Sequence, residues 1–502
     1  MSTRVRASDI VGEVDPRLYG GFVEHLGRHI YDGIFEPGHP AADEEGFRTD
    51  VIALVQELGV TTIRYPGGNF VSGYRWEDGI GPRESRPRRL DLAWRSTETN
   101  QVGLHEFSSW LEKVGSDLML AVNLGTRGVA EALDLLEYTN VAADTAWTRE
   151  RAANGRETPF DVRMWCLGNE MDGPWQLGHR NAEDYGKLAA RTAKAMRMLD
   201  PDVELVACGS SGRDMPTFGA WEREVLRHTF DDVDFISCHA YYQERNGQAQ
   251  EFLVSAVDTD LFVREVVAAA DEVAHERGSD KRIMLSFDEW NVWYQFADDG
   301  TKAGDLVPDG WPVAPRLLED QYNVMDAVVV GDLLITLLQH ADRVRSASLA
   351  QLVNVIAPIM TEPGGPAWRQ TTFHPFALTS RLGRGTVRAL DIEEAPRVQS
   401  ARYGEVSAVN AVATTDDAGT SVFAVNRSVT DAAELVIDLR ALDAASLSVV
   451  ESWIVTDANH RAANTLTEPE RVTPQTLEVV RHGDELRVSL PAVSWAVVRL
   501  GR

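Results

Sequence analysis

The feature that most constrains the fold is an alternation of short apolar runs with longer amphipathic segments between residues 17 and 375. Eight of the runs have the length and composition of buried strands, and helical patterns lie between them. Eight such repeats are typical of a closed (β/α)8 barrel, the TIM barrel. A doubly wound sheet usually has fewer strands and a glycine-rich first turn, which this chain lacks. The predicted strands are 18–23, 61–65, 118–123, 162–167, 204–208, 235–238, 283–287 and 346–352, and the clearest helices are 48–58, 105–114, 182–199, 261–276 and 326–340.

The pattern changes after residue 376, where helical periodicity fades and short β-type runs with turn-rich spacers begin. Runs of this kind indicate a β-sandwich, here of jelly-roll-like type. A strand-like piece at 4–10 precedes the barrel and is predicted to join the sandwich. We therefore expect an N-terminal strand in 1–16, a catalytic barrel in 17–375 and a C-terminal sandwich in 376–502. The sandwich runs are 421–425, 434–439, 447–455, 476–480, 485–489 and 493–500.

Charge limits the partners of such a chain. Asp and Glu outnumber Lys and Arg by 77 to 49, which gives a formal net charge of −28. A field of this sign repels phosphate backbones and anionic lipid surfaces, so we expect neither nucleic acid nor a membrane as a partner. The first residues lack the apolar core of a signal peptide, and no apolar run approaches the ~18–20 residues that cross a bilayer. A neutral substrate is favoured.

The cysteines point to a reducing compartment. Cys166, Cys208 and Cys238 each lie in a short apolar stretch with the character of a buried strand. Three cysteines cannot all pair, and no two of them have the local spacing of metal ligands. We expect three reduced core thiols and, with no signal peptide, a cytoplasmic location.

Polar and aromatic residues directly follow several predicted strands. They occupy 64–69 after the second strand, 168–170 after the fourth, 239–241 after the sixth and 288–291 after the seventh. In a barrel these positions all meet at the carboxyl-end mouth, where active sites are built. The segment 75–100, rich in Gly, Pro and Arg, is predicted to form a loop over this mouth.

Two carboxylates, Glu170 and Glu289, are the central candidates at this mouth. Either residue by itself would more often be a salt-bridge partner or a helix cap. Two carboxylates that flank one bond are what glycoside hydrolysis requires: one donates a proton to the leaving oxygen, and the other attacks the anomeric carbon or activates water. Trp175, Trp290, Trp293 and Tyr294 lie near them in the sequence and supply flat apolar faces on which sugars stack.

Five motifs closely resemble glycoside hydrolase family 51, the intracellular α-L-arabinofuranosidases. They are YGGFVEHLGR at 19–28, RYPGGNF at 64–70, PRRLDLAW at 87–94, LGNEMDGPW at 167–175 and DEWN at 288–291. The resemblance extends over nearly the whole chain. It implies a retaining double displacement with no cofactor and no metal, Glu170 as the acid/base and Glu289 as the nucleophile. The family's sugar-binding positions match Glu24, Asn69, Asn169, Tyr241 and Gln351.

The resemblance also implies a substrate and an assembly. The expected enzyme is exo-acting and releases terminal non-reducing α-L-arabinofuranosyl residues from arabinoxylan or arabinan oligosaccharides. Family members are often hexamers, so a homo-oligomer is implied. One alternative keeps the mechanism but changes the substrate, as in a galactofuranosidase, β-xylosidase or endoglucanase. Another is a non-catalytic carbohydrate-binding protein on an inactivated barrel, which the presence of both glutamates disfavours.

Further polar residues near the mouth have structural alternatives. His25 and His29 are four apart, a spacing that binds metal on a helix, but no acidic third ligand is evident, so hydrogen-bonding or packing roles are expected. His239 could touch the acid or the substrate, or be purely structural. Arg64 could form a buried ion pair beneath the glutamates.

Overall fold

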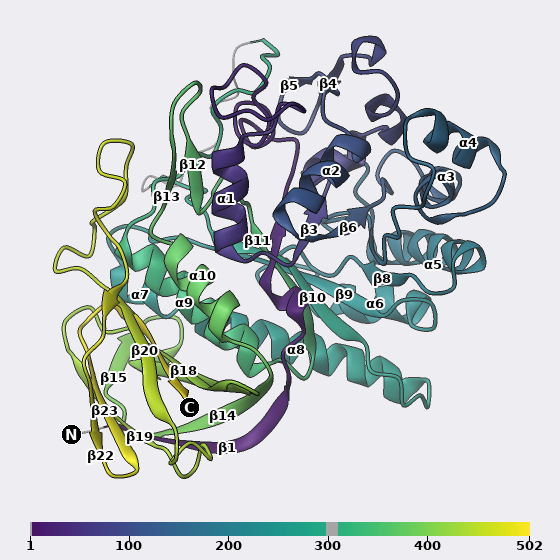
Figure 1. The fold of residues 1–502 in the computed structure, drawn as a ribbon. Coiled ribbons are helices and arrows are strands. Elements are labelled where there is room, and N and C mark those ends of the chain that lie inside the picture. Colours follow the sequence, from purple (N-terminus) through teal and green to yellow (C-terminus); the bar gives the residue numbers. More distant parts are fainter. Residues whose placement is uncertain (1–2, 298–309) are drawn as a thin grey trace.

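The computed structural model describes residues 3–297 and 310–502. Eight strands close into a parallel barrel in the order β10-β11-β2-β3-β6-β7-β8-β9, which Figure 1 shows surrounded by helices. Each strand overlaps one of the predicted runs, so the predicted (β/α)8 barrel is confirmed. The barrel strands are β2 (Gly20–Phe22), β3 (Thr62–Tyr65), β6 (Asp117–Ala121), β7 (Met164–Leu167), β8 (Glu204–Ala207), β9 (Phe235–Tyr242), β10 (Met284–Val292) and β11 (Val344–Ala350).

Every barrel strand differs from its predicted bounds by at least one residue, and the differences in three strands have a clear structural meaning. The first predicted run begins with a 3-10 helix, η1 (Pro16–Tyr19), because proline fits the first turn of a helix and the Asp15 side chain accepts a hydrogen bond from the Arg17 backbone N–H. Strands β9 and β10 continue further than expected, to Tyr242 and Val292. The polar residues expected just beyond these two strands therefore lie within them.

The five clearest helical patterns are all helices in the structure, and α5 has the bounds that were predicted. Its first turn is capped by Asn181, whose side chain accepts a hydrogen bond from the Asp184 backbone N–H. The helices are α1 (Thr49–Leu58), α2 (Leu104–Val114), α3 (Val129–Asn140), α4 (Ala146–Ala153), α5 (Ala182–Leu199), α6 (Ala220–Thr229), α7 (Ala249–Leu253), α8 (Ala256–Glu276), α9 (Val324–Gln339) and α10 (Phe373–Leu382).

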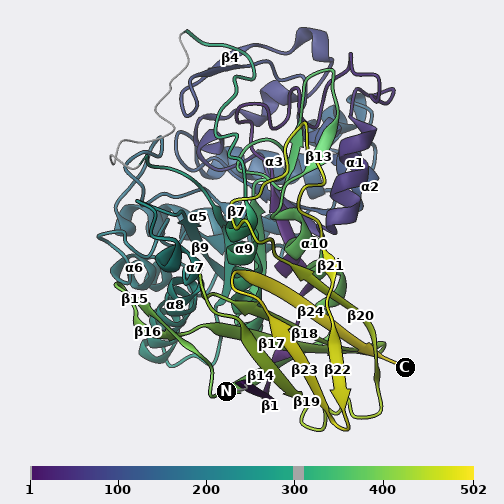
Figure 2. The same ribbon diagram turned by 90° about the vertical axis from the view of Figure 1, so that its left-hand side faces the viewer.

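The C-terminal strands form one sheet in the order β21-β20-β24-β18-β17-β14-β1-β19-β23-β22. The N-terminal strand β1 pairs antiparallel with β14 and parallel with β19. Val488 and Val498, which lie far apart in this order, share one apolar core, so the sheet folds over to enclose it (Figure 2). The strands are β1 (Thr3–Glu13), β14 (Thr386–Glu393), β17 (Val409–Asp416), β18 (Gly419–Asn426), β19 (Ala433–Asp438), β20 (Ser448–Val455), β21 (Gln475–Thr476), β22 (Val479–His482), β23 (Glu485–Leu490) and β24 (Ser494–Gly501).

Several short elements lie outside the two main sheets. The segment 75–100, expected as a loop, contains two 3-10 helices and the β4–β5 hairpin. The predicted boundary between residues 375 and 376 falls inside α10, and the predicted run 476–480 is divided between β21 and β22. The short elements are η2 (Asn69–Gly73), η3 (Trp76–Gly79), η4 (Arg83–Ser85), β4 (Arg89–Asp91), β5 (Ser96–Glu98), β12 (Ile359–Thr361), β13 (Ala367–Arg369), β15 (Arg397–Ser400) and β16 (Gly404–Ser407).

Helix α9 joins the barrel to the C-terminal sheet. It is buried around its whole circumference from Val324 to Leu338, as expected for a helix that is apolar on all sides. It contacts α8 and β10 of the barrel as well as β17, β18 and β24 of the sheet. Gly331 allows α9 to lie close to β24, because a Cβ atom at this position would lie only 2.2 Å from the Trp495 ring.

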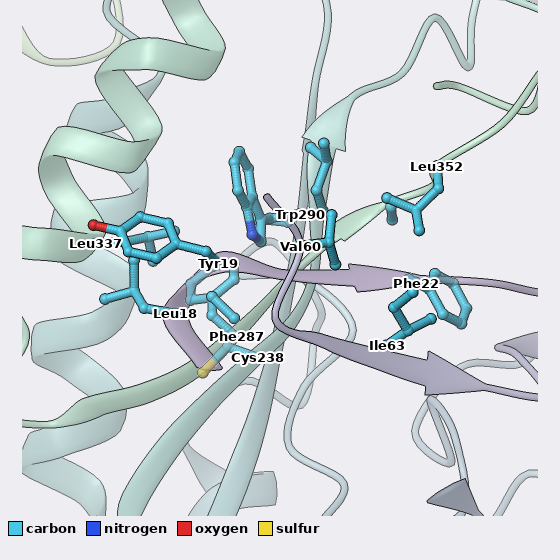
Figure 3. Packing of buried hydrophobic residues seen from close by; sticks show 14 of the residues in the cluster. Leu18, Tyr19, Phe22, Val60, Ile63, Cys238, Phe287, Trp290, Leu337 and Leu352 are labelled. Carbon is cyan, nitrogen blue, oxygen red and sulfur yellow. The ribbon is translucent and has the colours of Figure 1, made fainter. Parts of the chain in front are cut away.

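The apolar interior is continuous through the barrel and the helices around it. Figure 3 shows part of this cluster, including Phe22, Ile63 and Trp290. The prediction that Trp290 offers a face to a sugar is wrong, because this side chain is buried in the core. All three cysteines are buried and free, which confirms that prediction. Among the helices of the described residues, none has the length and apolar character needed to cross a membrane.

Candidate active site

A β-bulge places two consecutive carboxylates at the barrel mouth. Neighbouring residues of a regular strand point to opposite faces, but the pairing of β10 with β9 shifts register between Ser286 and Glu289. The pairing of β10 with β11 is shifted in the same region. As a result, Asp288 and Glu289 both face Arg64 on β3, at 3.8 Å from Nε to Asp288 Oδ2 and 2.8 Å from Nη1 to Glu289 Oε1.

Glu170 follows β7 in an unusual backbone conformation. Gly168 has φ of 95° and Glu170 has φ of 42°, both in the left-handed region that residues other than glycine rarely adopt. Such strain clusters at functional sites. The carboxylate of Glu170 accepts hydrogen bonds from Trp175 Nε1 at 2.7 Å and from His239 Nδ1 at 2.9 Å. These two donors orient it across the mouth.

His239 on β9 connects the carboxylates of two strands. Its Nδ1 contacts Glu170, and its Nε2 lies 2.9 Å from Asp288 Oδ1. Burial by itself would lower the pKa of His239, but Glu289, Asp288 and Glu170 raise it to about 10. The imidazole is therefore protonated and donates from both ring nitrogens. For Asp288, burial would raise the pKa, but Arg64 and His239 hold it below its ordinary value.

Glu289 is held by donors on both carboxylate oxygens. Arg64 Nη1 contacts Oε1, and the Tyr241 hydroxyl donates to Oε2 at 2.7 Å. Burial raises the pKa of Glu289 and Glu170 adds to the effect, while His239, Arg64 and Tyr241 oppose it. One oxygen of Glu289 and one of Glu170 lie within 4.8 Å of each other. The pair can thus reach the two sides of a single bond.

Glu24, which follows β2, has partners on both of its oxygens. Its Oε1 accepts hydrogen bonds from the Phe70 backbone N–H at 2.8 Å and from Trp94 Nε1 at 2.9 Å, and Gln351 Nε2 lies 3.2 Å from Oε2. Burial raises the pKa of Glu24 to about 8. The chain approaches it closely at Gly67, where a Cβ atom would lie 2.3 Å from Glu24 Cγ.

The predicted site residues come together around one cleft of about 930 Å³. Asn169 is the exception, since it lies beneath the cleft. Its Oδ1 accepts a hydrogen bond from Arg64 Nη2 at 2.7 Å, and its Nδ2 lies 3.4 Å from Gln176 Oε1. Asn169 thus contacts the guanidinium that binds the Glu289 carboxylate. The predicted residues that line the cleft are Glu24, Asn69, Glu170, Tyr241, Glu289 and Gln351.

Three residues of the site were not among those predicted to form it: Asp288, Trp94 and His29. Asp288 and Trp94 lie inside motifs that were noted, but their contacts depend on the bulge and on the folding of segment 75–100. His29 Nδ1 lies 2.5 Å from Gln351 Oε1, so this histidine positions a residue of the cleft. His25 instead contacts Glu98 and the Tyr65 hydroxyl, each at 2.9 Å.

The cluster of Glu170, His239 and Glu289 has the geometry of a potential metal site, with one atom of each within 4.8 Å of the others. A metal-binding histidine must be neutral and offer a lone pair. The carboxylates around His239 raise its pKa to about 10 and keep both ring nitrogens protonated. The arrangement therefore fits acid–base and nucleophilic chemistry better than metal binding.

Comparison with known proteins identifies the family. The model of the α-L-arabinofuranosidase 1 domain matches residues 54–258, and that of the α-L-arabinofuranosidase C-terminal domain matches residues 288–494. The structure of a family 51 α-L-arabinofuranosidase from Bifidobacterium longum is 50% identical, covers 99% of both chains and superimposes with a TM-score of 0.94. The chain belongs to the family 51 α-L-arabinofuranosidases.

Curated members of this family match nearly the whole chain. An intracellular exo-α-(1→5)-L-arabinofuranosidase from Streptomyces lividans is 58% identical over 97% of this chain and 73% of its own length. An exo-α-(1→6)-L-arabinofuranosidase from Bifidobacterium longum is 57% identical, over 98% of this chain and 95% of its own length. These two relatives are almost equally similar to the chain but are named for different linkages.

Proposed function

We propose that this family 51 member is an exo-acting, retaining enzyme that releases terminal non-reducing α-L-arabinofuranosyl residues from arabinose-containing oligosaccharides. The observation that carries the proposal is the pair Glu170 and Glu289, with one oxygen of each within 4.8 Å of the other. Retaining glycosidases hold the two carboxyl groups ~5–5.5 Å apart, whereas inverting enzymes separate them by ~6.5–9.5 Å to admit a water. The short separation favours direct attack by Glu289.

In the first step, a carboxylate oxygen of Glu289 forms a bond to the anomeric carbon of the arabinofuranose. The bond from that carbon to the leaving oxygen breaks, and the leaving oxygen takes a proton from Glu170. The product is a glycosyl ester on Glu289 and a free alcohol. Arg64 and Tyr241 contact the Glu289 carboxylate and hold it in place for this attack.

In the second step, Glu170 acts as the base. It takes a proton from a water molecule, whose oxygen bonds to the anomeric carbon while the ester bond to Glu289 breaks. Two inversions give arabinose with the configuration of the substrate. His239 donates to Glu170 and to Asp288, which keeps the acid/base oriented through both steps.

The inner end of the cleft supplies groups for the arabinose hydroxyls. Glu24, Asn69 and Gln351 line it, and the Trp94 indole is fixed against Glu24. Asn169 contacts Arg64 from below and is proposed to lie near the 2-hydroxyl. A buried, hydrogen-bonded end of this kind suits one terminal sugar, which supports exo action.

The proposal also covers the linkage that is cleaved, the cellular location and the oligomeric state. The names of two relatives support cleavage of α-(1→5) or α-(1→6) bonds, of which the second requires a hexose as the acceptor sugar. Arabinan and arabinoxylan fragments are proposed as substrates from the family resemblance. Several relatives are named intracellular, which supports a cytoplasmic enzyme that trims imported oligosaccharides. A homo-hexamer is proposed from the family resemblance alone.

The proposal is tested with aryl α-L-arabinofuranoside, aryl β-D-galactofuranoside and aryl β-D-xyloside, supplied in parallel. We expect rapid release from the arabinofuranoside, with the α-anomer of arabinose as the first product in time-resolved NMR. Initial formation of the β-anomer would contradict retention. Hydrolysis of another aryl glycoside, with no phenol released from the arabinofuranoside, would contradict the proposed substrate.

A further inference from the structure

The cleft extends well beyond the groups that would hold one arabinose. Its volume of about 930 Å³ is at the upper end of the ~300–1,000 Å³ that encloses drug-sized ligands, and this exceeds the needs of one pentose. Besides the catalytic end, it is lined by Arg213 after β8, by Tyr242 on β9 and by residues 401–403 of the C-terminal domain. The leaving part of a substrate would occupy this extension.

Residues 401–403 form the tip of the β15–β16 hairpin, which pairs only with itself, in a small two-stranded sheet. Figure 2 shows this hairpin as an arm that extends from the C-terminal domain toward the barrel helices. Glu251 on α7 anchors it, because its carboxylate accepts a hydrogen bond from Ser400 Oγ at 2.9 Å and another from the Ala401 backbone N–H. The barrel thus fixes the base of the tip.

Asp258 on α8 fixes the tip itself. This carboxylate is buried, and its Oδ1 contacts the Tyr403 hydroxyl at 3.0 Å and the guanidinium groups of Arg402 and Arg213 at 3.1 Å each. The Tyr242 hydroxyl donates to Oδ2 at 3.3 Å. One carboxylate therefore gathers a barrel loop, a barrel strand and the hairpin around the same part of the cleft.

This junction is directly connected to the catalytic centre. Tyr241 and Tyr242 are consecutive on β9: the first donates to the nucleophile Glu289, and the second donates to Asp258. Neighbouring residues of a strand point to opposite faces, so the two tyrosines link the catalytic centre and the hairpin tip through one strand while keeping them apart by the length of both side chains.

The chemistry of the junction suits a neutral polyhydroxylated ligand. The Arg402 side chain is 55% exposed and presents guanidinium N–H donors to the cleft, beside the half-buried ring of Tyr403. Arg213 is already paired with Asp258 and Glu265, so its charge is balanced. Balanced charge gives no strong attraction for an anion, whereas guanidinium donors and an aromatic ring both bind sugars.

We propose that Arg402 and Tyr403, supported by Arg213, form a subsite for the leaving-group oligosaccharide. This inference rests on the proposed function, and it assigns to the C-terminal domain a role in selecting longer substrates. The second and later sugar units of the leaving group contact the hairpin tip. An aryl leaving group is too short to reach it.

The test compares kcat/KM on an aryl arabinofuranoside with kcat/KM on linear arabino-oligosaccharides of increasing length. For Arg402→Ala we expect less than a twofold change on the aryl substrate and about a tenfold loss on the longest oligosaccharide, as for a lost hydrogen bond from a charged donor. Most of the loss should be in KM. The matched control is Arg397→Ala on the same hairpin, whose guanidinium pairs with Glu405 outside the cleft.

A second variant, Tyr403→Phe, retains the ring but loses the hydroxyl contact with Asp258, and we expect an intermediate loss that is also confined to long substrates. The subsite would be overturned if Arg402→Ala lost kcat/KM equally on short and long substrates, or if its kcat/KM did not differ from that of the wild type at any substrate length. In that case, activity of the wild type on the aryl arabinofuranoside would still uphold the proposed function. Wild-type inactivity on the aryl arabinofuranoside would overturn both.

Discussion

Arg64 and Glu289 form a buried ion pair, with Nη1 of the guanidinium 2.8 Å from Oε1 of the carboxylate. Burial raises the pKa of Glu289, and this contact, with His239 and Tyr241, opposes the rise. The pKa of Glu289 remains above its ordinary value, and the Arg64 contact favours the ionised form that a nucleophile needs for attack. The opposite side of the same guanidinium is fixed by Asn169.

The roles of the two glutamates predict different leaving-group dependence. Glu170→Ala removes the proton donor, so we expect a loss of about 10²–10⁴ on oligosaccharides. Its first step should remain fast on aryl arabinofuranosides with acidic phenols, which leave without a proton. Glu289→Ala should be almost inactive on every substrate. Initial rates over a series of substituted phenols measure this, and equal failure of both variants on the best leaving group would contradict the assignment.

His239 predicts a stability difference that depends on pH. Its pKa is raised in the folded state from 6.5 to about 10, so its charged contacts stabilise the fold fully below about pH 6.5. This stabilisation is lost as the pH rises through about 10. Comparing the free energy of unfolding of wild type and His239→Asn by denaturant titration should therefore show a gap that narrows from pH 7 towards pH 10. A gap that stays constant over this range would show that His239 is not charged in the fold.

Gly68 lies between Glu289, the proposed nucleophile, and Glu24, which is proposed to bind the sugar. A Cβ atom at this position would lie 3.1 Å from Glu289 Oε1 and 3.3 Å from Glu24 Oε2. Its backbone has φ of −85° and ψ of −106°, so a positive φ is not what requires glycine here. We predict that Gly68→Ala loses about tenfold in kcat/KM, because the methyl group enters the space between two groups that are proposed to contact the sugar.

The matched control is Gly38→Ala, since a Cβ atom at Gly38 would meet nothing within 4 Å. Activity of Gly68→Ala equal to that of Gly38→Ala would show that substrate does not use this space. A fall in melting temperature large enough to explain the lost activity would point to misfolding instead.

Substitution of Gly331 tests how much the packing of the barrel against the C-terminal sheet contributes to the free energy of unfolding. A Cβ atom there would lie 2.2 Å from the Trp495 ring, so Gly331→Ala forces α9 and β24 apart. Overpacking of this kind costs about 1–3 kcal/mol of unfolding free energy. Urea titration measures it, with Gly38→Ala, where a Cβ atom has open space, as the control. Equal unfolding free energies of the two variants would mean that the contact between α9 and β24 accommodates the added methyl group at little cost.

The sequence predicts those parts of this protein that depend on local periodicity. All eight barrel strands and the bounds of α5 were predicted from the spacing of apolar residues. The cleft residues were found because active sites of barrels lie at strand ends and because the motifs resemble a known family. Six of these residues line one cleft.

Features that depend on pairing between distant segments were not predicted. The bulge that turns Asp288 and Glu289 to the same side depends on the register of β10 against β9 and β11. Trp94 reaches Glu24 only after the segment 75–100 has folded over the mouth. The β15–β16 hairpin is short and largely exposed, so its sequence carries little apolar signal, and its position is set by Asp258 of the barrel.

The central claim is that Glu289 becomes covalently glycosylated while Glu170 serves as acid and base. The most direct measurement is mass spectrometry of Glu170→Ala after brief incubation with an aryl arabinofuranoside that carries a good leaving group. Without a base the glycosyl ester should accumulate, and the peptide that contains Glu289 should gain the mass of one anhydropentose unit. A rapid burst of phenol with no adduct, or with the adduct on another residue, would contradict the account.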